Sequence, residues 1–335
     1  MIMKILLIAS KSEFTDQVIR AFEKNSIEVL YLDDRKNYLF PKLFQNVSFF
    51  WQLTRRFGYL KDLSNQELNK KVIELCEKFK PDLVFIIKGM VIKESTLAKL
   101  HQMGIKTANW FLENLFIEPY KTWLPKNYGN FDYFFTCNSQ ELDYFPSTSK
   151  TKVIYLPVGV DPSYYELDEL TEEDRKRYSC DVCFVGASYP ERVEAMEYIK
   201  DLNLKIFGWE GWRKTELKSL YFGVLNTKEM AKLFNCAKIS INMAIQPPLH
   251  TANLRTFEIP AAGGFGLMDY RKDMDGLFKV GEEFAIFSDK KDLREKILFY
   301  LGNDKLRRSI VEAGHQKVLQ EHTLEKRVKF MLDFL

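Results

Sequence analysis

The chain carries a cation and a carboxylate at a spacing that a helix would bring together. Arg255 and Glu258 stand three residues apart, after the run Thr251-Ala252-Asn253-Leu254. We predict a helix over residues 254–262, on which residues three apart share a face. Its free amides near Asn253 could receive a diphosphate, and the Glu258 carboxylate could accept both hydroxyls of a ribose. The alternative is a surface Arg255–Glu258 ion pair worth ~0.5 kcal/mol or less.

A second candidate lies where a strand-like run meets a helix. Gly186 ends the apolar run 181–186, Ser188 follows, and Arg192 falls in the first turn of the next helix. Small residues let backbone amides approach a phosphate, whereas a cation at a helix N-terminus opposes the helix dipole. Arg192 is better placed if an anion lies between it and those amides. An ordinary tight turn with a surface arginine is the alternative.

Two single side chains complete the candidates. Glu113 follows the strand-like run 106–111 and could contact an acceptor or a transferred group, or it could cap the next helix. His250 lies just ahead of the 254–262 helix and is the histidine with a functional case among the four in the chain.

No metal site is predicted. Asp, His and Cys residues do not cluster at ligand spacing, and the CxxC pair Cys180 and Cys183 has no second pair to complete a site. The run around Cys183 is typical of a strand, which favours structural burial over zinc or redox chemistry. Five scattered cysteines suit a reducing cytoplasm.

Composition places the chain among ordinary globular proteins. It has 335 residues, 46% hydrophobic and 28% charged, which fits two domains of ~150 residues. A net charge of +3 is too small to predict nucleic-acid binding. No apolar run reaches the ~18 residues of a membrane span, so the aromatic and basic segment 49–57 indicates at most a peripheral membrane contact and more simply a packed domain edge.

The candidate residues are positioned by alternating strand-like and amphipathic helical runs, the pattern of α/β domains with parallel sheets. Strands are expected at 4–9, 28–32, 83–87, 106–111, 133–137, 153–156, 181–186, 205–207, 238–242, 266–268 and 283–287. A capping box at Ser64 predicts that one helix starts there and covers 66–79. We predict an N-terminal domain over 1–157, a linker over 158–178, a C-terminal domain over 179–322 and a last helix over 323–335 that reaches back to the first domain. Two such domains would bind ligand in a cleft between the carboxyl ends of their strands.

These residues resemble the bacterial spore maturation CgeB-like glycosyltransferases, whose C-terminal part is similar to the group 1 GT-B transferases. The resemblance rests on Tyr155-Leu156-Pro157-Val158-Gly159-Val160-Asp161, on residues 180–186, and on the Asn253-Leu254-Arg255-Thr256-Phe257-Glu258 block through Gly263. It covers about residues 130–335.

The resemblance implies a GT-B fold of two Rossmann-like domains and a metal-independent transferase without a cofactor. The donor would be a UDP-, dTDP- or GDP-linked sugar on the second domain, and the acceptor a saccharide, protein or lipid-linked group. By the same resemblance, Glu258 binds the ribose, Thr251–Leu254 offers amides to the diphosphate, Gly186 and Arg192 hold the phosphates, and Phe222 and Gly223 border the base. His250 stands where the family usually has the first glutamate of an E-x7-E pair, which leaves the sugar and retention of configuration open.

Two other functions fit the same sequence. A GT-B sugar-nucleotide epimerase or hydrolase would need no acceptor site. A spore- or envelope-associated binding protein would use the same scaffold without catalysis.

Overall fold

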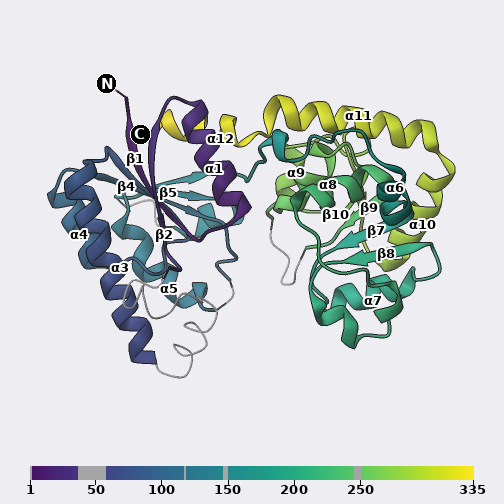
Figure 1. Ribbon diagram of the computed structural model, residues 1–335, viewed down its shortest axis with the longest axis horizontal. Coiled ribbons are helices and arrows are strands. Elements are labelled where there is room, and N and C mark those ends of the chain that lie inside the picture. The colour runs from purple at the N-terminus through teal and green to yellow at the C-terminus, as the bar shows by residue number, and fades with distance from the viewer. Residues whose placement is uncertain (1, 37–57, 117, 146–149, 245–249) are drawn as a thin grey trace. The chain divides into compact units, whose positions relative to one another are not determined.

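A computed structural model describes residues 2–36, 58–116, 118–145, 150–244 and 250–335 of the chain. The chain forms two compact units (Figure 1). The first comprises Met1–Pro157 with Val328–Leu335, and the second comprises Val158–Arg327. The aromatic and basic segment 49–57 lies outside the described residues.

The first unit is built on a six-stranded, wholly parallel sheet in the order β2-β1-β3-β4-β5-β6. Its strands are short apolar runs. The strand Leu83–Ile87 is buried along its whole length and Lys4–Ala9 is buried after Lys4, as expected for a sheet covered on both faces. The strands are β1 (Lys4–Ala9), β2 (Glu28–Asp33), β3 (Leu83–Ile87), β4 (Lys106–Phe111), β5 (Tyr133–Thr136) and β6 (Lys152–Tyr155).

Among the described residues before Pro157, the α-helices are α1 (Glu13–Lys24), α3 (Gly58–Phe79), α4 (Glu94–Gln102) and α5 (Tyr120–Asn127). The Ser12 side chain caps α1 by accepting from the Thr15 amide. The predicted start of a helix at Ser64 is wrong, because α3 already begins at Gly58 and Ser64 is buried inside it. The capping pattern at Ser64 therefore does not mark the N-terminus of the helix, which begins further upstream.

The second unit has a five-stranded parallel sheet in the order β11-β10-β9-β7-β8. The strands are β7 (Cys180–Val185), β8 (Leu204–Phe207), β9 (Ala237–Asn242), β10 (Gly266–Asp269) and β11 (Ala285–Phe287). Helices α8 (Thr227–Cys236) and α9 (Leu254–Ala261) pack together against β9, whereas α7 (Pro190–Tyr198) and α10 (Lys290–Gly302) pack together elsewhere in the unit. A core containing Val182, Met196, Ile239 and Ile297 joins α7 and α10 to the sheet.

Each sheet has one place where the strand order reverses. In the first unit β1 lies between β2 and β3, and in the second β7 lies between β8 and β9. Open parallel sheets bind ligands at such a point, outside the carboxyl ends of the strands. The loops after β1 and β3, and those after β7 and β9, are therefore the places to look for a site.

Residues 158–178, expected as a linker, are folded into the second unit. They include α6 (Glu172–Tyr178), which begins with a Thr171–Asp174 capping box. Val160 pairs with Thr323, ahead of α12 (Leu324–Leu332), and the Val160 amide donates to the His322 carbonyl at 3.2 Å. Residues 328–335 belong to the first unit. Among the helices of the described residues, none carries an apolar stretch long enough to cross a membrane.

Candidate functional site

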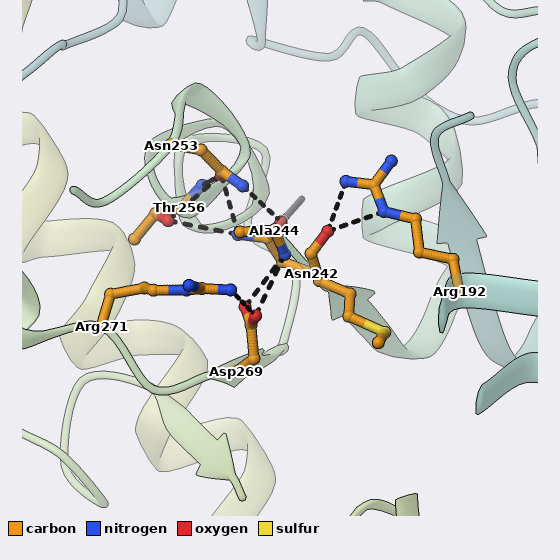
Figure 2. A network of polar contacts seen from close by, with 8 residues as sticks. Arg192, Asn242, Ala244, Asn253, Thr256, Asp269 and Arg271 are labelled. Atoms are coloured by element: carbon orange, nitrogen blue, oxygen red, sulfur yellow. Dashed lines mark hydrogen bonds and ion pairs between the residues drawn. The ribbon is translucent and has the colours of Figure 1, made fainter. Parts of the chain in front are cut away.

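The end of β9 holds the start of α9 in the second unit (Figure 2). Asn242, the last residue of β9, is 6% exposed, and its amide exchanges two hydrogen bonds with the Asn253 amide at 2.9 and 3.0 Å. Asn253 also caps α9, because its Oδ1 accepts from the Thr256 amide at 3.2 Å. The N-terminus of α9 is thereby fixed at the carboxyl end of the central strand, where its free N–H groups favour an anion.

Arg192 comes from the first turn of α7 and lies in the same place. Its Nε donates to the Met243 carbonyl at 3.0 Å, and its two terminal nitrogens donate to the carbonyls of Met243 and Ala187. The side chain is 8% exposed, so the surface arginine considered above is excluded. Burial lowers the pKa of Arg192, yet a guanidinium stays charged in any protein. With five N–H groups and these three hydrogen bonds, Arg192 keeps N–H donors that an anion beside α9 could use.

The loops after β7 and β8 touch closely through glycines. A Cβ on Gly208, where φ is +122°, would lie 2.4 Å from the Gly186 carbonyl oxygen. That oxygen also accepts from the Trp212 indole at 2.8 Å. A Cβ on Gly211 would lie 2.3 Å from Ser188 Oγ. These contacts explain by packing why Gly208 and Gly211 carry no side chain, and a Cβ on Gly186 would lie 3.0 Å from the Phe184 ring. The phosphate contacts predicted for Gly186 and Ser188 remain a prediction.

Glu258 is enclosed by donors of the protein. It is 5% exposed; its Oε1 accepts from the Tyr165 hydroxyl at 2.7 Å, and its Oε2 accepts from Arg255. Arg255 also lies 3.0 Å from the Met230 sulfur and stacks over the Phe234 ring. The pair is therefore a part-buried assembly between α9, α8 and Tyr165, rather than a solvated surface pair. These partners support a role for Arg255 in holding Glu258.

The remaining donor-side candidates lie along the same edge. The His250 carbonyl accepts from the Asp273 amide at 3.0 Å, which fixes the chain ahead of α9. Thr251 and Leu254 are partly exposed and Ala252 is buried. Phe222 is 50% exposed and packs on Phe207, the last residue of β8, and Gly223 accepts from the Gly208 amide at 2.8 Å.

Glu113 lies in the first unit, just after β4, in a mixed cluster of charged and hydroxyl groups. It forms an ion pair with Lys88, which follows β3 and has a φ of +72°. Tyr120 lies against Glu113, and burial, together with the Glu113 charge, raises the pKa of Tyr120 to about 12. Nearby, the Ser10 hydroxyl donates to Asp34 at 2.8 Å, and burial raises the pKa of that carboxyl. The cluster therefore lies at the strand-order reversal of the first sheet.

The partners of the candidate residues were not predicted from the sequence. Tyr165 is 93 residues from Glu258. Lys88 follows β3 whereas Glu113 follows β4, and Asp269 ends β10 whereas Arg192 lies on α7. For Lys88 and Asp269 the sequence did offer a signal, because Lys88 directly follows a strand and Asp269 ends one. No group of carboxylates, histidines or cysteines within the described ranges could hold a metal ion. Cys180 and Cys183 are buried, and the Cys183 thiol donates to Ser240 at 3.3 Å.

Comparison with known proteins gives a match over most of the second unit. A family profile described as glycosyl transferase-like matches residues 190–333. An uncharacterized protein of Aquifex aeolicus (strain VF5) is 24% identical over 148 residues, which are 43% of this chain and 36% of that protein. The chain thus matches about a third of that relative's length.

Three solved structures share the fold. Sucrose-phosphate synthase from Thermosynechococcus elongatus superposes with a TM-score of 0.71 at 10% identity, covering 99% of this chain and 98% of that one. Anabaena Alr3699/HepE in complex with UDP and glucose gives 0.66 at 11%, covering 99% and 100%. The alpha,alpha-trehalose-phosphate synthase (UDP-forming) from Burkholderia xenovorans gives 0.65 at 11%, covering 98% and 99%.

The predicted fold class is confirmed, because two parallel-sheet units and these neighbours make this a GT-B protein. The match of residues 190–333 to a glycosyl transferase-like profile agrees with the predicted class of enzyme. At such low identities the likeness to solved structures establishes the fold alone.

Proposed function

We propose that the protein transfers a glycosyl group from a nucleoside-diphosphate sugar, bound at the carboxyl edge of the second sheet, to an acceptor. One observation carries this proposal: the capped N-terminus of α9 and the buried Arg192 guanidinium meet at the end of β9, where the strand order reverses. A helix N-terminus and an arginine together favour a diphosphate. Two neighbours add support, since HepE is in complex with UDP and glucose, and the Burkholderia enzyme is named as UDP-forming.

The chemistry proposed is displacement of the diphosphate from the anomeric carbon. The bond to the β-phosphate oxygen breaks, the acceptor oxygen forms the new glycosidic bond, and the acceptor proton leaves with the diphosphate or to solvent. Negative charge grows on the leaving phosphate, where Arg192 and the α9 amides can stabilise it without moving. We propose that this stabilisation replaces a metal ion, and that the reaction retains configuration.

The other roles follow from the residues at each edge. Glu258 would accept the ribose hydroxyls on the lone pairs that Tyr165 and Arg255 leave open. Phe222 and Gly223 would border the base. In the first unit, Glu113 beside Lys88 would contact the acceptor, for which a saccharide, protein or lipid-linked group are all compatible. We also propose that the protein is a member of the CgeB-like glycosyltransferases that its sequence resembles.

The test is a donor panel of UDP-, GDP- and dTDP-sugars, with and without EDTA and with candidate acceptors. The proposal expects one nucleotide to bind most tightly, transfer that depends on an acceptor, and rates that EDTA leaves unchanged. Turnover without any acceptor would indicate an epimerase or hydrolase. Binding without turnover would indicate a binding protein, and activity that returns only with Mn²⁺ or Mg²⁺ would contradict metal independence.

A further inference from the structure

One peptide group at the end of β9 is held from two sides by opposite charges. The Met243 carbonyl accepts two bonds from Arg192, and the next amide, that of Ala244, donates to both oxygens of Asp269 at 3.1 and 3.2 Å. A carbonyl and the following N–H are two ends of the same planar group. Figure 2 shows Arg192 and Asp269 reaching it from different sides.

The charges of Arg192 and Asp269 match the dipole of the peptide group that they contact. Arg192 places its positive charge at the oxygen end, and Asp269 places its negative charge at the N–H end, so each strengthens the polarisation that the other induces. Arg271, 6% exposed, forms an ion pair with Asp269 and keeps its carboxylate in place. Burial lowers the pKa of Arg192, and the charge of Asp269 is among the effects that oppose this lowering.

The same short segment also supports α9. Asn242 immediately precedes this peptide and holds the Asn253 cap. From the β10 side, the Asp273 amide donates to the His250 carbonyl, which lies ahead of α9. The residues at the end of β9 therefore link Arg192 to the start of α9. The segment 269–273 bonds to the end of β9 through Asp269 and to the residue ahead of Thr251 through Asp273.

We propose that Asp269 is a positioning residue for donor binding: through the Met243–Ala244 peptide it fixes the guanidinium of Arg192 beside the α9 N-terminus. This inference rests on the proposed function, because it names a residue that sets up the same diphosphate site. Asp269 acts through Arg192 and does not itself contact the donor, since a carboxylate would repel a phosphate.

The experiment uses the full chain labelled with ¹⁵N and compares wild type, Asp269→Asn, Arg271→Gln and Asp201→Asn. Two quantities are measured: the hydrogen-exchange protection of the Ala244 amide and the Arg192 Nε–H without ligand, and the Kd for UDP. Asp201→Asn is the matched control, because it breaks an exposed aspartate–arginine pair in the same unit.

Asp269→Asn should lose protection at both groups and weaken UDP binding about tenfold or more, as expected when a charged hydrogen bond no longer orders its partner. Arg271→Gln removes the ion pair that supports Asp269 but leaves the carboxylate that accepts from Ala244, so its loss of UDP affinity should be smaller. Asp201→Asn should match wild type. If Asp269→Asn does not fold, Asp269→Glu replaces it, since it keeps the charge but displaces the carboxylate; altered Arg192 protection with weaker UDP binding is again expected.

Wild-type UDP affinity in the Asp269 variant would overturn the inference, as would a loss of affinity with Ala244 and Arg192 protection unchanged. A wild-type protein that binds neither UDP, GDP nor dTDP would overturn the proposed function instead. The positioning role would then be judged on the protection of Arg192 and Ala244 alone.

Discussion

The carboxylate of Glu258 lies between two donors of the protein itself, the Tyr165 hydroxyl and the Arg255 guanidinium. These two hydrogen bonds fix the orientation of the carboxylate, and each oxygen keeps a lone pair that can accept from a ligand. A carboxylate held in this way pays little ordering entropy when a ribose binds. The same contacts make Glu258 a structural residue as well as a candidate binding residue.

Glu258→Gln should therefore reduce both stability and nucleotide binding. The amide accepts through one oxygen and turns an NH₂ toward a donor, so the free energy of unfolding should fall by about 1–3 kcal/mol. UDP affinity should fall as well, and the variant should discriminate less between UDP and its 2′-deoxy form. Urea unfolding and calorimetric titration with both nucleotides measure these effects.

The matched control for this prediction is Glu295→Gln, which removes an exposed carboxylate paired with Lys291. It should change neither quantity, because exposed pairs contribute little. A Glu258→Gln protein that binds UDP and 2′-deoxy-UDP as wild type does would remove Glu258 from the ribose site and leave it a structural role.

At this scale, the sequence predicted the residues that form local patterns. Arg192, Asn253 and Glu258 stand out because each has a fixed offset from a glycine or a helix start. Tyr165 and Asp269 could not be found in this way, since their contacts depend on how distant segments pack. The partners of Arg255 were missed for the same reason, because Met230 and Phe234 belong to another helix.

At the scale of elements, His322 joins the end of α11 (Asp304–Glu321) to its surroundings. Its Nε2–H donates to the Leu277 carbonyl at 2.8 Å, and its Nδ1 accepts from Arg327 at 2.9 Å, so the ring is neutral. The rings of Phe257 and Phe278 pack on it. Burial, and then the Arg327 charge, lower the pKa of His322 from 6.5 to about 4.

This depressed pKa predicts a loss of stability in mild acid. Between about pH 6.5 and pH 4 the unfolded chain binds a proton at His322 that the folded chain does not, so the free energy of unfolding falls as the pH falls. The full loss is about 3 kcal/mol and is complete below the folded pKa. His322→Gln can keep both hydrogen bonds without titrating, so urea unfolding across this range should show a flatter pH dependence. An unchanged dependence would mean that other groups produce it.

The elements themselves were largely predictable, because buried parallel strands appear as short apolar runs between helical ones. The strands at 4–9, 83–87 and 106–111 have the predicted bounds. The failures were at boundaries that packing decides. Ser64 carries a good capping pattern, yet the helix runs through it, and residues 158–178 lack periodicity, yet they are held by contacts with α8 and α12.

At the scale of the whole molecule, the candidate groups divide between the two units. The groups proposed for the donor belong to the second, and the cluster of Glu113, Lys88 and Tyr120 belongs to the first. Each set lies where its own sheet reverses strand order. A change in one set should therefore affect one substrate more than the other.

Glu113→Gln tests this division. Removing the carboxylate takes away the partner of Lys88 and one acceptor for substrate hydroxyls, so turnover should fall about tenfold or more, the effect of a lost charged hydrogen bond. The Kd for UDP should stay near the wild-type value, because the residues proposed to hold it belong to the other unit. Glu74→Gln is the matched control, since Glu74 pairs with Lys71 on the exposed face of α3. A loss of UDP affinity larger than the loss of turnover would place Glu113 at the nucleotide or in the structure of the first unit, and the division of roles would not hold.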